Sequence, residues 1–313
     1  MQLNKILMKE LIQWFLNYAS MFTSPEPEKE KMFAVKKEHS MIVCHEIGQL
    51  GQEMHLDQDA IILARIMGLF HDVGRFEQAK RFGTFKDSCS LDHGELGEQI
   101  LRENQVINKL DHVQRELVFK AVRYHNRKML PSGEDRACLF YTSLLRDADK
   151  LDIYRVIRNK LTGDPHFGAV SPSGVAPCNG GCSKKVLESL EKGSIVDYED
   201  IKSATDYRLF LVSWVYDIKH PPTAKRLKER RYIAQLQQGL PGIPQINQAV
   251  CNALEFLEKK ASGENGALAW LDGANERHGK AKAIMSNNSR NKIEAPLAKH
   301  LADAIRAKRI KDQ

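Results

Sequence analysis

Several histidines and aspartates occur where a buried helix would normally carry apolar side chains. His71 and Asp72 directly follow the apolar run IILARIMGLF, and His39 and Asp149 each interrupt an apolar helical face. A buried carboxylate is costly unless it is paired or bound to a metal. Taken singly, each residue is more often a hydrogen-bonded core histidine or half of a local salt bridge. Taken together, they predict a buried metal site.

Two further histidines extend this set. His93 follows Asp92 in LDHGELGEQILREN, and His125 ends a predicted helix in AVRYHNRK. Imidazole and carboxylate ligands suit Mn, Fe, Co, Ni or Zn, whereas a site without cysteine disfavours soft metals and iron–sulfur clusters. A second ligand pair allows one or two divalent ions, and two ions about 3.5–4 Å apart suit the displacement of a phosphoryl group.

The composition narrows the class of protein. The chain has 313 residues, 42% hydrophobic and 28% charged, with a net charge of +7, which predicts a globular protein that is soluble. The positive charge suits anionic partners, although solvated lysines explain most of it equally well. The six cysteines are too sparse for a disulfide scaffold, so we expect reduced thiols, including Cys178 and Cys182, and a cytoplasmic location.

Helical periodicity dominates and predicts an all-α fold. The N-terminal segment has charged interruptions that a signal peptide lacks, and no apolar stretch approaches the ~20 residues of a membrane span. Asp92 is expected to cap a helix, with Glu95 completing a capping box. Other helices are expected at about 33–52, 57–72, 109–126, 138–161, 183–192, 198–219, 223–238 and 245–261.

Two segments lack this pattern. Residues 162–182 are rich in proline and glycine and predict a long loop of the kind that often covers a site. The chain from 262 to 313 is predicted to be a basic, weakly structured extension. We therefore expect an amphipathic helix in residues 1–24 that packs on a core of residues 25–261, followed by the extension.

The order of the candidate ligands resembles a known family. His39…His71-Asp72…Asp149 is similar to the His…His-Asp…Asp signature of the HD-domain superfamily of metal-dependent phosphohydrolases, over roughly residues 33–160. The resemblance implies an all-α helical bundle with ligands projecting from several helices. It also implies a first metal ion held by those four residues, although Asp147 and Asp152 compete with Asp149 for the last position.

The same resemblance extends to a second ion in the dinuclear branches. It implies that His93 and His125 hold this ion, with Asp72 bridging to the first. The chain lacks the His-His pair and the Gly-Tyr-Pro of the cyclic-di-GMP phosphodiesterases, and its HDVGR core lacks the extra histidine of the deoxynucleotide triphosphohydrolases. No accompanying synthetase or ligand-binding domain is evident, so the resemblance implies a stand-alone enzyme without naming its substrate.

The expected activity is hydrolysis of a phosphoester, with a nucleotide or a related phosphorylated small molecule as substrate and a metal-bound hydroxide as nucleophile. Asp72 and Arg75 are the expected catalytic residues. Arg75 is also the first candidate for binding phosphate oxygens, because guanidinium forks suit them. The other candidate substrate-binding cations, for which a solvated basic face is the simpler interpretation, are Arg81, Lys86, Arg123 and Arg127.

Two other functions remain open at this point. A dinuclear iron oxygenase of the same superfamily would use a closely similar ligand set. A non-catalytic regulatory or nucleic-acid-binding protein would make use of the basic tail. The sequence assigns neither the general acid nor the oligomeric state.

Overall fold

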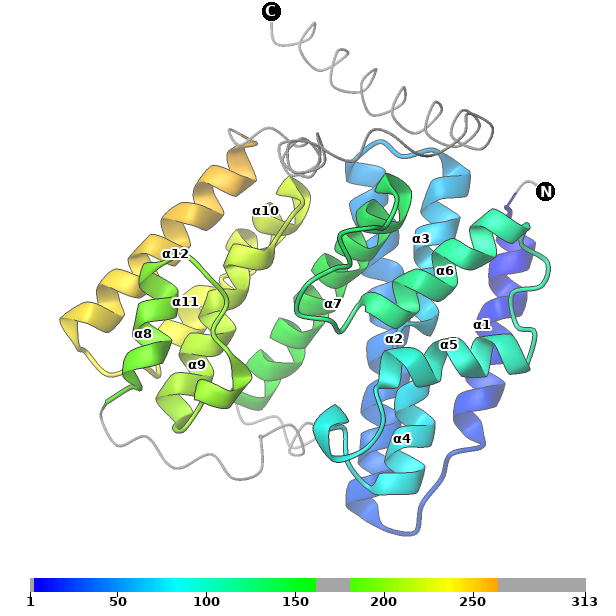
Figure 1. The fold of residues 1–313 in the computed structure, drawn as a ribbon, viewed down its shortest axis with the longest axis horizontal. Helices are drawn as coiled ribbons and strands as arrows, with labels where there is room; N and C mark the ends of the chain where they lie inside the picture. The colour runs from blue at the N-terminus through cyan, green and yellow to red at the C-terminus, as the bar shows by residue number, and fades with distance from the viewer. Residues whose placement is uncertain (1–2, 162–180, 264–313) are drawn as a thin grey trace, which may run out of the picture. The chain divides into compact units, whose positions relative to one another are not determined.

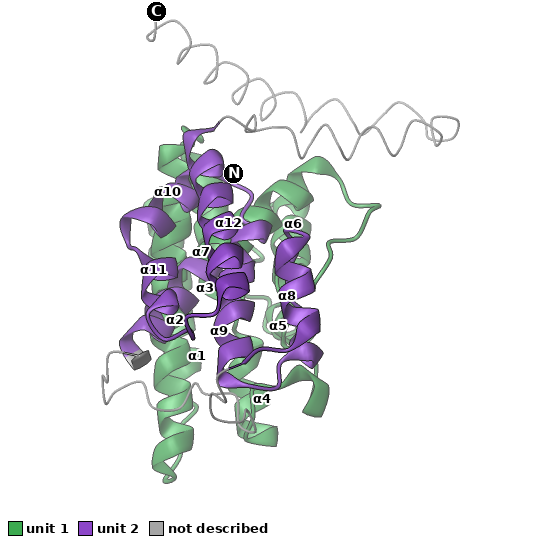
Figure 2. Ribbon diagram, turned by 90° about the vertical axis from the view of Figure 1, so that its left-hand side faces the viewer, with its two compact units in different colours: residues 1–149, 270–313 green, residues 150–269 purple. Residues whose placement is uncertain are grey.

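The computed structural model describes residues 3–161 and 181–263, and within these ranges the chain forms helices and turns without a strand. The all-α prediction is confirmed. The chain divides into two compact units, one containing residues up to Asp149 and one containing Lys150–Ala269 (Figure 2). The predicted boundaries at residues 24 and 261 stay predictions, and the loop at 162–180 and the tail from 264 lie outside the described residues.

The first unit is built from helices that pack in sequence-adjacent pairs (Figure 1). Helix α2 makes its most extensive contacts with α3, and α5 lies against both α4 and α6. Its helices are α1 (Lys5–Ser20), α2 (Pro27–Glu53), α3 (Gln58–Phe70), α4 (Gly74–Phe82), α5 (His93–Glu103), α6 (His112–Tyr124) and the first part of α7 (Arg136–Leu161).

The expected helices of this unit are confirmed, with two differences. Helix α2 begins at Pro27 rather than near residue 33, because proline needs no amide hydrogen at the first helical position. Helix α4 was not expected at all, since residues 74–82 are mostly polar or charged. The burial of Phe76 and Ala79 explains it, because this short helix is held by tertiary packing rather than by its own propensity.

Aspartate side chains define the starts of several of these helices. Asp57 accepts a hydrogen bond from the Ala60 amide at 2.8 Å, and Asp92 accepts one from the Gly94 amide at 2.8 Å. The prediction that Asp92 caps α5 is confirmed. The prediction that Glu95 completes a capping box is wrong, because its carboxylate instead accepts a hydrogen bond from Arg127 Nη2 at 3.0 Å.

An aromatic cluster joins α1 to the segment that carries the HDVGR motif. Phe15 packs edge-on against Phe70, with ring centroids 6.3 Å apart, and against Phe76, at 5.9 Å. Both partners are at most 1% exposed, and aromatic pairs of this kind contribute roughly 0.5–1.5 kcal/mol each beyond their burial. Because Phe70 precedes His71 and Phe76 follows Arg75, α1 fixes both ends of the turn between α3 and α4.

The second unit contains the rest of α7 and the helices that follow the undescribed loop. Helix α10 packs mainly on α12, and Tyr154 of α7 stacks on Tyr232 with ring centroids 5.7 Å apart. Its other helices are α8 (Lys184–Glu191), α9 (Ala204–Ser213), α10 (Pro221–Glu229), α11 (Tyr232–Gln237) and α12 (Pro244–Ser262). Among the described helices, none combines the length and apolar content needed to cross a membrane. The cytoplasmic location stays a prediction.

Two expected helices of this unit are broken in the structure. The stretch expected at 198–219 starts its α-helix only after Ser203, whose side chain caps α9 in a capping box. The stretch expected at 223–238 is divided into α10 and α11 at Arg231, which has a left-handed φ of 55°. Periodicity alone did not reveal either interruption, because the apolar pattern continues across both.

Burial of His220 should make this unit sensitive to acid. The ring is 2% exposed, and burial, with the charges of Lys260 and Lys219, lowers its pKa from 6.5 to about 3. Between pH 6.5 and 3 the unfolded chain therefore binds a proton that the folded chain excludes. The free energy of unfolding falls as the pH falls, by up to about 1.4 kcal/mol per pH unit from this group.

The variant His220→Asn tests this contribution. It is expected to lose about 2–3 kcal/mol less stability than the wild type between pH 6.5 and 4.5, measured by urea denaturation at both pH values. His45→Asn, which changes an exposed histidine, should keep the wild-type pH dependence. Equal pH dependence in the wild type and His220→Asn would show that the buried ring does not govern the acid response.

Candidate metal centre

The structure brings all six predicted ligands together in the first unit. They come from the interior of α2, the end of α3, the turn that follows it, the first residue of α5, the end of α6 and the interior of α7. In that order they are His39, His71, Asp72, His93, His125 and Asp149. Helices α3 and α6 end, and α5 begins, next to the cluster, so the side chains at these three helix ends lie close together.

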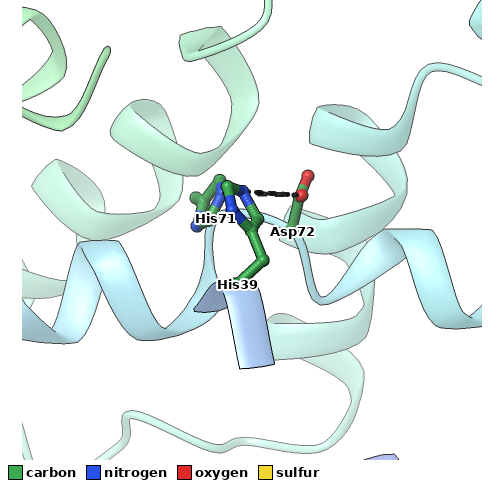
Figure 3. Close-up of side chains that lie close together, drawn as sticks. All are labelled: His39, His71 and Asp72. Carbon is green, nitrogen blue, oxygen red and sulfur yellow. Dashed lines mark hydrogen bonds and ion pairs between the residues drawn. The ribbon is translucent and has the colours of Figure 1, made fainter. Parts of the chain in front are cut away.

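One pair of histidines faces Asp149 and one oxygen of Asp72. The Nε2 atoms of His39 and His71 are 3.1 Å apart, and Asp149 Oδ1 lies 3.1 Å from the first and 3.7 Å from the second. Asp72 Oδ2 lies 3.5 Å from both nitrogens. Figure 3 shows the two rings side by side with the Asp72 carboxylate next to them.

The other pair of histidines faces the second oxygen of Asp72. The Nε2 atoms of His93 and His125 are 3.0 Å apart, and Asp72 Oδ1 lies 3.3 Å from the first and 3.7 Å from the second. The two oxygens of one carboxylate therefore face different histidine pairs. This is the arrangement that a carboxylate bridging two ions requires.

The hydrogen bonds of the rings fix which nitrogen carries the proton. Nδ1 of His71 lies 2.9 Å from the Gly68 carbonyl, Nδ1 of His125 lies 2.7 Å from the Val122 carbonyl, and Nδ1 of His93 lies 2.7 Å from Asp87 Oδ2. Since each of these partners is an acceptor, Nδ1 must donate, and the neutral ring has its lone pair on Nε2.

The facing nitrogens are suited to sharing a cation. Burial lowers the pKa of His71, and burial with the nearby charge of Arg75 lowers the pKa of His93 to about 4, so both rings are neutral at pH 7. The lone pairs of His93 and His125 then point at each other across 3.0 Å. Two nitrogens bound at about 2.1 Å to one ion, at right angles, lie about 3 Å apart. The residues present fit a divalent metal.

The carboxylates of the cluster are charged at neutral pH. Burial alone would raise the pKa of Asp72, but the Lys36 ammonium, 2.6 Å from Oδ2, and the Arg75 guanidinium hold it well below its usual value. Burial opposes ionisation of Asp149 in the same way, and the hydrogen bond with His39, whose Nε2 lies 3.1 Å from Oδ1, lowers its pKa. Both can act as anionic ligands without a change of pH.

The fold distinguishes among the three aspartates of α7 that are candidates for the fourth ligand of the first ion. Among the three candidates on α7, Asp149 is the one whose carboxylate groups with the histidines. Asp152 Oδ1 instead accepts a hydrogen bond from Arg155 Nε at 2.6 Å, and Asp147 is fully buried outside the groups of convergent donors found among the described residues. The geometry therefore favours Asp149, as expected.

Asp87, Asp92 and His93 form another acidic group, but its oxygens already serve other donors. Asp87 Oδ1 accepts from Arg75 Nη1 at 2.9 Å and from Gln78 Nε2 at 2.8 Å, and Asp92 Oδ1 caps α5. This group is poorly suited to an additional cation. Asp87 instead fixes the orientation of the His93 ring, as carboxylates commonly do for histidines that bind metals.

Asp87→Asn should weaken metal binding at the His93–His125 pair by about 10- to 100-fold, because the ring loses its anionic hydrogen-bond acceptor. Calorimetric titration of the metal-free protein with Mn²⁺ measures this, with Ser88→Ala as the control in the same exposed turn. Unchanged affinity for the more weakly held ion would show that Asp87 does not orient His93 for binding.

The predicted cation Arg75 lies directly beside the cluster. Its Nη1 donates to Gln78 Oε1 at 2.8 Å and to Asp87. Its Nε is buried without a hydrogen-bond partner, 3.5 Å from Asp72 Oδ1. A buried guanidinium N–H without an acceptor is costly, so this atom is well placed to receive an oxygen from a ligand.

The other predicted cations are engaged elsewhere. The side chains of the three arginines are 38–53% exposed and form ion pairs with glutamates, of which Glu98 is buried. Lys86 is exposed. The pairs are Arg81–Glu77, Arg123–Glu98 and Arg127–Glu95. Ion pairs between exposed side chains, such as Arg127–Glu95, contribute little to stability. A role for these four residues in binding substrate stays a prediction.

Sequence reasoning missed three residues at the cluster. Lys36 could have been found, because it lies three residues before His39 and therefore on the same face of α2. Asp87 lies in a polar loop, and Asn126, whose Nδ2 donates to Asp87 Oδ2 at 3.1 Å, follows a helix end. No local pattern marks those two, since only tertiary packing brings them to His93.

Comparison with known families agrees with this geometry. Residues 37–154 match the model of the HD domain, a span that contains all six clustered side chains. No curated protein matched the chain, and no solved structure did. HD domains are typical of metal-dependent phosphohydrolases and bind divalent metals through histidine and aspartate, the residue types found here. Residues 37–154 of the chain therefore carry an HD domain.

Proposed function

We propose that this protein is a metal-dependent phosphohydrolase that cleaves a phosphoester, with a nucleotide or a related phosphorylated small molecule as substrate. The observation that carries the proposal is the pair of facing Nε2–Nε2 contacts, 3.1 and 3.0 Å long, on the two sides of Asp72. Proteins use this arrangement of neutral imidazoles around a shared carboxylate to hold two divalent ions.

Each ligand has a place in this proposal. One ion would be held by His39, His71, Asp72 and Asp149, and the other by His93, His125 and Asp72. The donor types suit Mn, Fe, Co, Ni or Zn. When bound, the metal ions would lower the pKa of a water molecule and so supply a nucleophile at neutral pH.

The protein's own groups would position the substrate. Arg75 has a buried Nε without an acceptor beside Asp72, so a phosphoryl oxygen at this point would satisfy it. Asp87 and Gln78 hold the other end of the guanidinium and thereby restrict its rotation. A pre-oriented cation at the position where negative charge develops lowers the barrier without further reorganisation.

Arg75 also distinguishes this proposal from the oxygenase alternative. A dinuclear iron oxygenase would use the same six ligands, and the donor set alone does not separate the two reactions. A buried guanidinium N–H directed at the ligand cluster is suited to an oxyanion of the substrate. This favours phosphoester hydrolysis over oxygenation. The basic tail, which suggested nucleic-acid binding as another alternative, lies outside the described residues.

The test is metal content together with turnover. The protein would be purified without chelator, its metals measured by mass spectrometry, and release of phosphate assayed on a nucleotide panel with added Mn²⁺, Co²⁺, Ni²⁺, Mg²⁺ or Fe²⁺. His39→Ala is expected to lose a bound ion and at least ~10³-fold in turnover. His45→Ala removes an exposed histidine from the same helix and should match the wild type.

Two outcomes would overturn the proposal. About two iron ions per chain, oxygen consumption and no hydrolysis of any phosphoester would assign the oxygenase activity. Absence of bound metal and of turnover under every condition would leave a regulatory role for the domain.

A further inference from the structure

Lys36 lies at the cluster in a position that mirrors Arg75. Its Nζ is 2.6 Å from Asp72 Oδ2, whereas Arg75 Nε is 3.5 Å from Asp72 Oδ1. The two cations therefore face the two oxygens of one carboxylate, each on the side of a different histidine pair. Lys36 is the partner of the oxygen that faces His39 and His71.

Both cations lie at the rim of the cluster rather than in its interior. Their side chains are 18% and 15% exposed, whereas Asp72 is 4% exposed. Both also lie beside the ring of Phe85, with Lys36 Nζ 5.4 Å and Arg75 Cζ 5.6 Å from its centroid. Phe85 thus lies beside both the ammonium and the guanidinium at the partly exposed rim of the cluster.

Metal binding would change the partners of these cations. A carboxylate that coordinates ions has less negative charge to offer to Lys36 and Arg75, and both would then face the position of the substrate. A partly buried ammonium without a counter-ion is energetically costly, so binding of another anion beside it becomes favourable. An anionic substrate supplies that charge at the same place.

We propose that Lys36 is a second substrate-binding cation, which acts with Arg75 as a clamp across Asp72 and selects phosphate monoesters over diesters. This inference rests on the phosphohydrolase function proposed above. It assigns a substrate class, since the clamp gives two protein cations to one phosphoryl group in addition to the metal ions.

The chemistry of the two ester classes explains the selection. A phosphate monoester has three non-ester oxygens and is mostly dianionic at pH 7, because its second pKa is about 6. A diester has two non-ester oxygens and one charge, so it offers one oxygen and about one charge fewer to the metal ions and the two cations. Charge-assisted hydrogen bonds to phosphate are about twice as strong as neutral ones, and the monoester gains one more of them.

The simplest competing explanation is that Lys36 only neutralises Asp72. In that case its removal would lower metal affinity and thermal stability, and it would affect monoester and diester substrates equally. Substrate binding therefore has to be measured separately from metal binding.

The experiment compares Lys36→Met with Lys37→Met, which removes the exposed lysine next in the sequence. The Mn²⁺-loaded proteins would be titrated calorimetrically with inorganic phosphate and assayed with p-nitrophenyl phosphate and bis(p-nitrophenyl) phosphate. Lys36→Met should raise the Kd for phosphate and the KM for the monoester by about 10- to 100-fold. The diester should change much less, metal content should stay at the wild-type level, and Lys36→Arg should recover most of the loss.

The outcomes separate the two proposals. If the wild type hydrolyses phosphoesters and Lys36→Met binds phosphate as tightly as Lys37→Met, the proposal that Lys36 binds substrate is wrong and the proposed phosphohydrolase function stands. Loss of metal in Lys36→Met, with no recovery in Lys36→Arg, would assign Lys36 as the counter-ion of Asp72 and overturn the clamp. A wild-type preference for the diester would overturn the proposed selectivity. If the wild type shows neither turnover nor phosphate binding, both proposals fail.

Discussion

Asp72→Asn is expected to lower the metal content of the protein and to reduce phosphoester turnover by about 10³-fold or more. Asp72 offers Oδ2 to the His39–His71 pair and Oδ1 to the His93–His125 pair. Asparagine keeps the size of the side chain but has one oxygen and no charge, so it cannot bridge two ions. Metal analysis after dialysis and steady-state assays measure the two effects.

Asp59→Asn is the matched control for this change. It makes the same substitution in the first turn of α3 and leaves intact the helix cap formed by Asp57. It should keep wild-type metal content and turnover. Two ions per chain in Asp72→Asn, held as tightly as in the wild type, would contradict the bridging role of this carboxylate.

Gly74→Ala is expected to destabilise the first unit and to displace His93 from the cluster. A Cβ at Gly74 would lie 2.3 Å from the His93 carbonyl oxygen and 2.8 Å from the Gly97 amide nitrogen. Both are backbone atoms of α5, so the contact is relieved only if α4 and α5 move apart. Overpacking of this kind typically costs about 1–3 kcal/mol, and here it acts directly on a proposed ligand.

The measurements for Gly74→Ala are the free energy of unfolding by urea and the number of bound ions. We expect a lower midpoint and loss of the ion held by His93 and His125, with the other ion retained. Gly133→Ala serves as the control, because no atom lies within 4 Å of the added Cβ. Wild-type stability and two bound ions in Gly74→Ala would show that α4 and α5 tolerate the methyl group without moving His93.

The packing of α4 against α5 therefore explains why the HDVGR motif has a glycine at position 74, which the sequence alone did not suggest. Gly74 begins α4 at the point where this helix contacts the backbone of His93 and Gly97 on α5. The close approach brings His93 beside Asp72, since Asp72 lies two residues before Gly74. The absence of a side chain at Gly74 thus allows the turn that carries Asp72 to pack against the start of α5, which carries His93.

The sequence determined the class of fold and the identity of the candidate ligands. Apolar periodicity is a local property, so the long helices α3, α6 and α7 were predicted close to their observed bounds, and α2 was predicted except for its first six residues. Histidines and aspartates on apolar faces were equally visible, because their burial cost appears wherever the pattern is interrupted. His39, His71, Asp72 and Asp149 could be identified in this way before their positions in space were known.

The tertiary structure decided what these residues do together. It assigned the two oxygens of Asp72 to different histidine pairs, and it directed the Nδ1 atoms to acceptors so that Nε2 faces the centre. It also added Lys36 and Asp87 to the cluster and paired the three peripheral arginines with glutamates outside it. The positions of Asp72, Lys36 and the two histidine pairs depend on contacts between residues more than 30 positions apart in the chain, and on burial within one unit. Local sequence patterns contain neither, so only the packed fold could supply them.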